Sequence, residues 1–170
     1  VSVFTNMTLV NSEVAEKLAR LEIFTLTSLD GHVREVFEAV RGAGTWERFL
    51  RGVRHARDAG VELHINIAVT ELNWMYVDKI IDKAIELNGA SVSLIPSMPA
   101  GNALKNKVYV TSDHFKQVLA KAAEKAEELG FDIRRDFKLK RAVTAAEPLL
   151  PEVKDTFEQK YGIKITNGIG

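Results

Sequence analysis

Short apolar runs with the composition of β-strands alternate with amphipathic segments at helical spacing through the first 130 residues. The runs that predict strands are "VSVF" at 1–4, "IFTLTS" at 23–28, "VELHINIAV" at 61–69 and "SVSLIP" at 91–96. Helical patterns lie between and after them, at 12–21, 33–40, 46–59, 73–88 and 112–129. Connections of this length join parallel strands through right-handed crossovers. The alternation therefore predicts an α/β protein with a parallel sheet, or part of a (β/α) barrel.

The helix after the third predicted strand has the clearest signals. Asn73 is placed to cap it, and Gly89 is placed to end it. Its predicted core face consists of Val77, Ile80, Ile81, Ala84 and Ile85. After Gly130 the pattern weakens, and one more helix is expected over 152–162. We interpret 1–133 as one domain and 134–170 as a C-terminal extension.

Composition excludes several classes of protein. Lys and Arg number 23 and Asp and Glu number 23, so the net charge is zero and no global field attracts nucleic acid. No apolar run approaches the roughly 20 residues of a membrane-spanning helix, and the start lacks the layout of a signal peptide, so we expect a cytoplasmic protein without a membrane partner. The chain has no cysteine, which excludes disulfides, thiolate nucleophiles and cysteine-bound metal centres within it.

Polar or glycine-rich turns follow all four predicted strands. These turns are Thr5-Asn6, "SLDG" at 28–31, Thr70 with Asn73, and "PSMPAGN" at 96–102. In parallel α/β proteins, ligands bind at the carboxyl ends of the strands. The sequence therefore predicts a ligand site at this edge of the sheet.

The third predicted strand has one apolar and one polar face. Its apolar residues are Leu63, Ile65, Ile67 and Val69. If that face lies under the helices, His64 and Asn66 point into a barrel lumen, where a buried amide without a partner costs about 1–3 kcal/mol. A ligand is a candidate for that partner. In the second strand, Thr25 and Thr27 alternate with Leu26 and Ser28, and the pattern leaves open which pair faces inward.

Five segments, taken in order, resemble the radical S-adenosylmethionine (SAM) superfamily. They are Thr5-Asn6, "SLDG" at 28–31, "RGAGTWERFLRGVRHARDAGV" from Arg41, "INIAVTELN" ending at Asn73, and "MPAGNA" from Met98. The chain looks most like the branch with a C-terminal SPASM-like auxiliary domain, which includes haem-tailoring and peptide-modifying enzymes and resembles the molybdenum-cofactor cyclases. The resemblance implies a partial (β/α)6 barrel, of which this chain supplies about the third to the sixth strand.

The resemblance also implies roles in binding the cosubstrate, S-adenosylmethionine. Ser28 is expected to contact its amino-acid end, and Asp30 to shape the turn. Arg41 is expected to bond to the cosubstrate carboxylate, and the main chain around Met98 to lie against the adenine. Asn6 belongs to a turn that resembles the family's T-N-G motif, although Met7 stands where glycine is usual.

On the substrate side, the resemblance implies contacts from Thr5, His64 and Asn66. The substrate class is a bulky cofactor precursor or a peptide. No catalytic or metal-binding residue is predicted within this chain.

The family's radical chemistry depends on a C-x3-C-x2-C loop that holds a [4Fe–4S] cluster, and on a G-G-E-P turn. This chain contains neither. Two interpretations stay open: the chain is the middle of a longer enzyme, lacking the N-terminal barrel strands and the auxiliary domain, or it is a degenerate member kept for binding. Its first and last segments favour the former. A partial barrel also leaves sheet edges unpaired, so we expect association through them.

Structural roles compete with these functional ones. "SLDG" is also an ordinary turn sequence, His64 and Asn66 are equally explained by hydrogen bonds to their neighbours, and Arg41 suits a helix C-terminus. Two other function classes remain: a non-enzymatic binding or scaffold module, and an unrelated aldolase-type (β/α) barrel. The strand ends offer no Schiff-base lysine for the latter, since Lys79 and Lys83 fall within a predicted helix.

Overall fold

The computed structural model describes residues 1–131, 141–144, 154–156, 158–159, 162 and 164–167. The chain forms two compact units, Val1–Ala123 and Glu124–Gly170. The first contains every predicted site residue. The predicted division between 1–133 and 134–170 stays a prediction. Among the described residues, no helix is long and apolar enough to cross a membrane.

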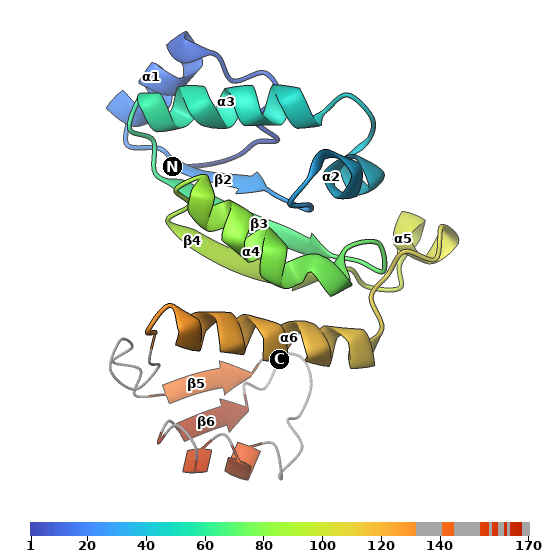
Figure 1. Ribbon diagram of the computed structural model, residues 1–170. Helices are drawn as coiled ribbons and strands as arrows, with labels where there is room; N and C mark the ends of the chain where they lie inside the picture. The colour runs from blue at the N-terminus through green and yellow to red at the C-terminus, as the bar shows by residue number, and fades with distance from the viewer. Residues whose placement is uncertain (132–140, 145–153, 157, 160–161, 163, 168–170) are drawn as a thin grey trace. The chain divides into compact units, whose positions relative to one another are not determined.

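The first unit is built on a four-stranded sheet in the order β1-β2-β3-β4 (Figure 1). The strands are β1 (Ser2–Phe4), β2 (Phe24–Ser28), β3 (Leu63–Val69) and β4 (Ser91–Pro96). All neighbours pair in parallel, with Phe4 opposite Leu26, Ser28 opposite Asn66, and Asn66 opposite Ser93. The predicted α/β class with parallel strands is confirmed, and all carboxyl ends meet at one edge.

The helices of the first unit match the predicted pattern closely. They are α1 (Ser12–Arg20), α2 (Arg34–Arg41), α3 (Trp46–Asp58), η1 (Trp74–Tyr76), α4 (Val77–Glu86), α5 (Gly101–Lys105) and α6 (Ser112–Glu128), the last of which runs across both units. α1 begins where Asn11 Oδ1 accepts a hydrogen bond from Val14 N at 2.9 Å, the usual N-cap contact.

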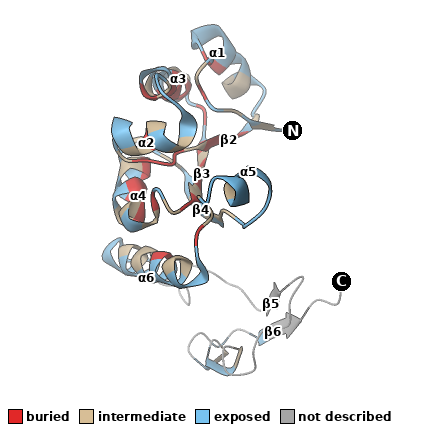
Figure 2. Ribbon diagram, turned by 90° about the vertical axis from the view of Figure 1, so that its right-hand side faces the viewer, coloured by how far each residue is buried: buried red, intermediate tan, exposed pale blue. Residues whose placement is uncertain are grey.

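One face of the sheet packs under the helices and forms the core. Figure 2 shows α2, α3 and α4 on the same side of the strands. Along β3, buried and half-buried residues alternate strictly, and the buried set is the predicted apolar one. In β2 the buried pair is Thr25 and Thr27, which answers the question left open by the sequence: Leu26 and Ser28 lie on the other face, with His64 and Asn66.

Three predictions about local structure differ from the structure. Asn73 does not cap α4, because α4 begins at Val77 and the Asn73 amide is engaged elsewhere. Ile85 is 45% exposed and so does not belong to the core face of α4. The turn predicted over 96–102 after β4 leads at Gly101 into the short helix α5, which the sequence did not predict.

The second unit is described only in part. It contains β5 (Arg141–Thr144) and β6 (Lys164–Asn167), which pair in parallel. Within the helix predicted over 152–162, residues 154–156 and 158–159 are described and are helical.

Candidate functional site

A pocket of about 220 Å³ lies at the carboxyl edge of the sheet, beside the ends of β1 and β2. Five of the predicted site residues line it: Thr5, Asn6, Ser28, Arg41 and Asn66. The structure thus brings together side chains that are up to 61 positions apart in the sequence, from Thr5 to Asn66. Phe4, Leu26 and Thr27 complete the lining.

The turn after β1 holds its own side chains in place. Thr5 Oγ1 accepts a hydrogen bond from Met7 N at 3.1 Å, and Asn6 Oδ1 accepts one from Thr8 Oγ1 at 2.8 Å. Met7 has φ 62°, in the left-handed region, and its side chain is fully buried. The backbone therefore has the positive φ that a glycine would adopt readily, although a methionine occupies the position.

Asp30 and Arg41 form an ion pair beside the pocket. Arg41 Nε donates to Asp30 Oδ2, while Asp30 Oδ1 accepts a hydrogen bond from Ala68 N at 2.7 Å. Burial raises the pKa of Asp30, against the lowering effects of Arg41 and of the bond from Ala68. The carboxyl of Asp30 joins β2, β3 and α2 but does not line the pocket.

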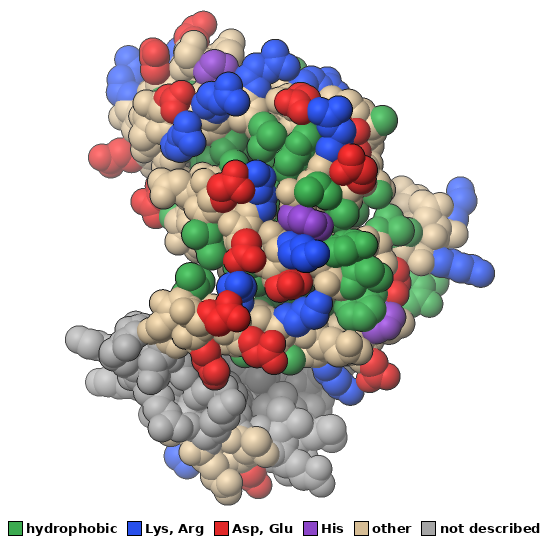
Figure 3. All heavy atoms as spheres, viewed as in Figure 1, with side chains coloured by type: hydrophobic (Ala, Val, Ile, Leu, Met, Phe, Trp, Pro, Cys, Tyr) green, Lys and Arg blue, Asp and Glu red, His purple; other side chains and the backbone are tan. Residues whose placement is uncertain are grey.

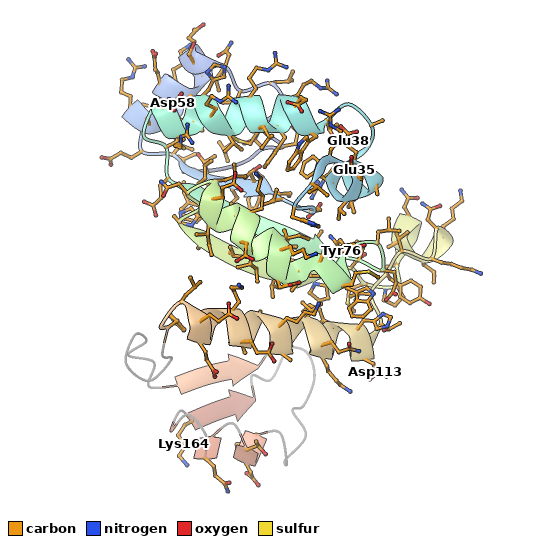
Figure 4. All side chains as sticks on the ribbon, in the orientation of Figure 1. Glu35, Glu38, Asp58, Tyr76, Asp113 and Lys164 are labelled. Carbon is orange, nitrogen blue, oxygen red and sulfur yellow. The ribbon has the colours of Figure 1, made fainter. Side chains whose placement is uncertain are left out.

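Arg41 is placed by a tight corner between α2 and α3. Glu38 Oε1 accepts a hydrogen bond from Trp46 N at 3.0 Å, and Thr45 Oγ1 donates to Gly42 O at 2.6 Å. Glu38 is labelled on α2 in Figure 4. The hydrogen bond from Trp46 N lowers the pKa of Glu38. The ionised form of Glu38 therefore stabilises the corner between α2 and α3.

Asn73 is a residue whose place in this network the sequence did not predict. It is fully buried, and its amide bonds to Asp30 O, Ala68 O and Thr70. A buried role for Asn73 was suggested by its place shortly after a buried strand. The same place also fits the N-cap of the following helix, which is the role that the sequence predicted.

His64 lies away from this pocket. It is the second residue of β3, at the amino end of the strand, where its Nδ1 is 2.8 Å from Ser91 Oγ and its ring stacks on Phe24 at 3.9 Å. It lines a separate pocket of about 440 Å³. Its contacts are those of a histidine bonded to its neighbours, and its role toward a substrate stays a prediction.

Met98 also lies outside the pocket lining. Its side chain is 65% exposed in the segment after β4, and its carbonyl accepts a hydrogen bond from Ala100 N at 2.8 Å. Ser97 N donates to Val69 O, which fixes the start of this segment to the end of β3. The predicted contact of its main chain with adenine stays a prediction.

The surface and the donor set limit what the site can hold. Side chains of both signs are interspersed over α3 and α4 (Figure 3), in keeping with the zero net charge. Among the described residues, no three His, Asp or Glu side chains are grouped as metal ligands. A [4Fe–4S] cluster does not fit this chain, because it has no cysteine. The pocket instead offers one guanidinium with hydroxyl and amide groups, which suit an amino-acid ligand.

A parallel sheet with helices on one face and a polar pocket at its carboxyl edge is the arrangement of part of a (β/α) barrel. Comparisons with known proteins agree with this class. Two curated relatives are named AdoMet-dependent heme synthase. The one from Oleidesulfovibrio alaskensis is 31% identical over 94 residues, which are 54% of this chain and 24% of the relative. The one from Methanosarcina barkeri is 32% identical over 99 residues, which are 57% of this chain and 28% of the relative. The chain thus spans about a quarter of their length. No family model matches it.

Solved structures show the same fold. Native anSMEcpe with bound AdoMet and Cp18Cys peptide has a TM-score of 0.65 at 19% identity, covering 76% of this chain and 38% of that one. Native anSMEcpe with bound AdoMet has a TM-score of 0.50 at 23% identity, covering 55% and 27%. The resemblance to the radical SAM superfamily, in its SPASM-type branch, is confirmed over the part covered, and so is the partial barrel.

Proposed function

We propose that this chain is the cosubstrate- and substrate-binding part of a radical SAM enzyme that modifies a cofactor precursor or a peptide. The observation that carries the proposal is the pocket at the carboxyl edge, where Ser28, Arg41, Asn6, Thr5 and Asn66 meet. These are residues to which the sequence resemblance assigns binding. As a cysteine-free piece, the chain by itself is proposed to be inactive in radical chemistry.

Each side chain has a distinct task in this proposal. Ser28 Oγ accepts from the ammonium group of S-adenosylmethionine, and Arg41 donates to its carboxylate. Asn6 and the main chain at Met98 contact the remainder of the cosubstrate. In a complete enzyme of this class, a reduced [4Fe–4S] cluster held outside this chain would supply the one electron that cleaves S-adenosylmethionine into methionine and a 5′-deoxyadenosyl radical, and this radical would take a hydrogen atom from the substrate.

The substrate is proposed to lie along the face of the sheet opposite the helices. Thr5, Asn66 and His64 are its contacts, and Leu26 adds apolar surface between β1 and β3. The names of the similar proteins include heme synthases and a peptide complex, which supports a cofactor precursor or a peptide. A cytoplasmic location, without nucleic acid or membrane partners, completes the proposal.

Titration calorimetry of this chain with S-adenosylmethionine tests the proposal. We expect saturable binding, weakened about tenfold by Ser28→Ala and by Arg41→Gln, because each removes one charge-assisted contact worth about 1.4 kcal/mol. Ser12→Ala and Arg51→Gln are matched controls on exposed positions of α1 and α3, and should bind as the original chain does. A folded chain that shows no binding contradicts the proposal.

A binding module without radical activity is the second candidate, favoured by the lack of cysteine. The complete natural gene product, purified without oxygen, distinguishes the two. A low-temperature EPR signal of a reduced cluster that changes on adding S-adenosylmethionine supports the enzyme. If no cluster forms after reconstitution with iron and sulfide, the binding module is supported instead.

A further inference from the structure

Asn73 uses the full hydrogen-bonding capacity of its amide in a fully buried position. Its Oδ1 accepts from Thr70 N at 2.7 Å and from Thr70 Oγ1 at 3.2 Å. Its Nδ2 donates to Asp30 O at 3.0 Å and to Ala68 O at 2.9 Å. Asn73 therefore fixes the main chain at Asp30 against the end of β3.

Asp30 in turn divides its two carboxylate oxygens between the sheet and Arg41. One oxygen accepts from Ala68 N, and the other accepts from Arg41 Nε. Arg41 lines the pocket and its side chain is 33% exposed. Within the part of the chain that the structure describes, the two terminal nitrogens of Arg41 make no hydrogen bond, so their four N–H groups are available to a ligand.

We propose that Asn73 is a positioning residue, which acts through Asp30 to hold Arg41 with its terminal nitrogens available to a ligand carboxylate. The inference rests on the proposed function, since it deepens the account of the same pocket. Asn73 does not line that pocket, so any effect it has on the ligand passes through other residues. A guanidinium held at Nε keeps its planar fork in one orientation, which lowers the ordering cost of binding a carboxylate.

The substitution Asn73→Asp tests this role because it is nearly isosteric. It keeps the acceptor for Thr70 N but removes both donors, and it places an oxygen against Asp30 O and Ala68 O. Gln117→Glu makes the same amide-to-carboxylate change on an exposed position of α6 and serves as control. Circular dichroism and thermal unfolding establish that each variant is folded at the temperature of the assay.

Binding is compared for S-adenosylmethionine and for its decarboxylated analogue. We expect Asn73→Asp to weaken binding of the first about tenfold and of the second less than twofold, since only the first has the carboxylate that Arg41 holds. In the Arg41→Gln background, Asn73→Asp should have no further effect. Equal losses for both ligands, or additive losses in the double variant, would show a merely structural role and overturn the inference.

A second measurement needs no ligand, so it separates this inference from the proposed function. In ¹⁵N NMR spectra, Arg41 Nε–H should exchange slowly with water in the original chain and in Gln117→Glu, and rapidly in Asn73→Asp. Slow exchange in all three would overturn the inference even where S-adenosylmethionine binds. If the original chain binds no S-adenosylmethionine but the exchange rates change as expected, the proposed function fails and the positioning of Arg41 stands.

Discussion

Asp30 and Arg41 form an ion pair in which the carboxylate is fully buried while the guanidinium side chain is one-third exposed. The pair is therefore asymmetric. Asp30 is held inside the first unit by Ala68 N, and Arg41 extends from it to the pocket. This arrangement gives a structural reason for an aspartate two residues after the end of β2, because its buried carboxylate orients the guanidinium that lines the pocket.

Replacing Asp30 by asparagine should destabilise the first unit. The substitution removes the ionic partner of Arg41, and it places an amide N–H against either Arg41 Nε or Ala68 N. We therefore expect the free energy of unfolding at neutral pH to fall by about 2–4 kcal/mol. Urea unfolding measures this, with Asp58→Asn at the exposed end of α3 as the matched control (Figure 4). A loss no larger than that of the control contradicts the assigned role.

The stability conferred by Asp30 should depend on pH with a definite sign. Its pKa in the folded chain is raised above 3.8 by burial, so the folded state binds its proton more tightly than the unfolded state does. The stabilisation by Asp30 is therefore larger at acid pH than at neutral pH, where the loss of about 2–4 kcal/mol applies, and it decreases as the pH rises above 3.8. The difference in unfolding free energy between the original chain and Asp30→Asn should shrink over that range, whereas a growing difference contradicts the raised pKa.

The sequence predicted the fold of the first unit well because its signals are local and periodic. Strict alternation along Leu63–Val69 and helical spacing along α1, α3 and α6 depend only on near neighbours. The carboxyl-edge pocket followed from topology, since parallel strands place their ends together. The places of Thr5 and Asn66 at this edge followed from the strand pattern, whereas the face of β2 on which Ser28 lies was left open by the sequence.

The bonds of Asn73 and the location of His64 could not be predicted in the same way. Asn73 bonds to Asp30, 43 positions earlier, and no local pattern separates such a partner from a helix cap. The side chain of His64 was assigned to the correct face, but it lies five residues before the carboxyl end of β3 at Val69, beside Leu26 and Ser91. The alternation of a strand fixes the face of a side chain and not which pocket along that face it reaches.

Gly52 should be intolerant of any side chain. A Cβ at this position in α3 would lie 2.0 Å from Met7 O, and the buried Met7 turn cannot retreat without disturbing the core. We expect Gly52→Ala to cost about 3 kcal/mol or more, although alanine favours helices. Denaturant unfolding checks this against Arg51→Ala, an exposed neighbour on α3. A stability within about 1 kcal/mol of the original would refute the close contact.

The outer strand β1 should mediate association of this chain. β1 and β4 flank the four-stranded sheet, and Phe4 is 73% exposed on β1. Because a charge on an edge strand opposes pairing, Phe4→Lys should lower the weight-average mass seen in sedimentation at rising protein concentration. Leu9→Lys is the matched control, since Leu9 is 85% exposed but lies outside the strand. Equal effects of both substitutions would point to nonspecific apolar association instead.

Glu71 and His114 join the loop after β3 to the start of α6. Both carboxylate oxygens of Glu71 lie close to His114 Nδ1, at 2.8 and 2.9 Å, and Trp74 stacks on the histidine ring at 4.0 Å. Partial burial raises the pKa of Glu71, but the bonds from His114 and from Thr111 N outweigh it, so the pKa lies below 4.5.

Because the pKa of Glu71 is lowered by folding, its contribution to stability is present above pH 4.5 and is lost as pH falls through the folded pKa. The difference in unfolding free energy between the original chain and Glu71→Gln should therefore grow as pH rises, opposite to the trend expected for Asp30. Glu16→Gln, exposed on α1, serves as control. Unfolding by urea at several pH values measures both trends. If the difference in unfolding free energy between the original chain and Glu71→Gln did not change with pH, these contacts would not favour the carboxylate form of Glu71.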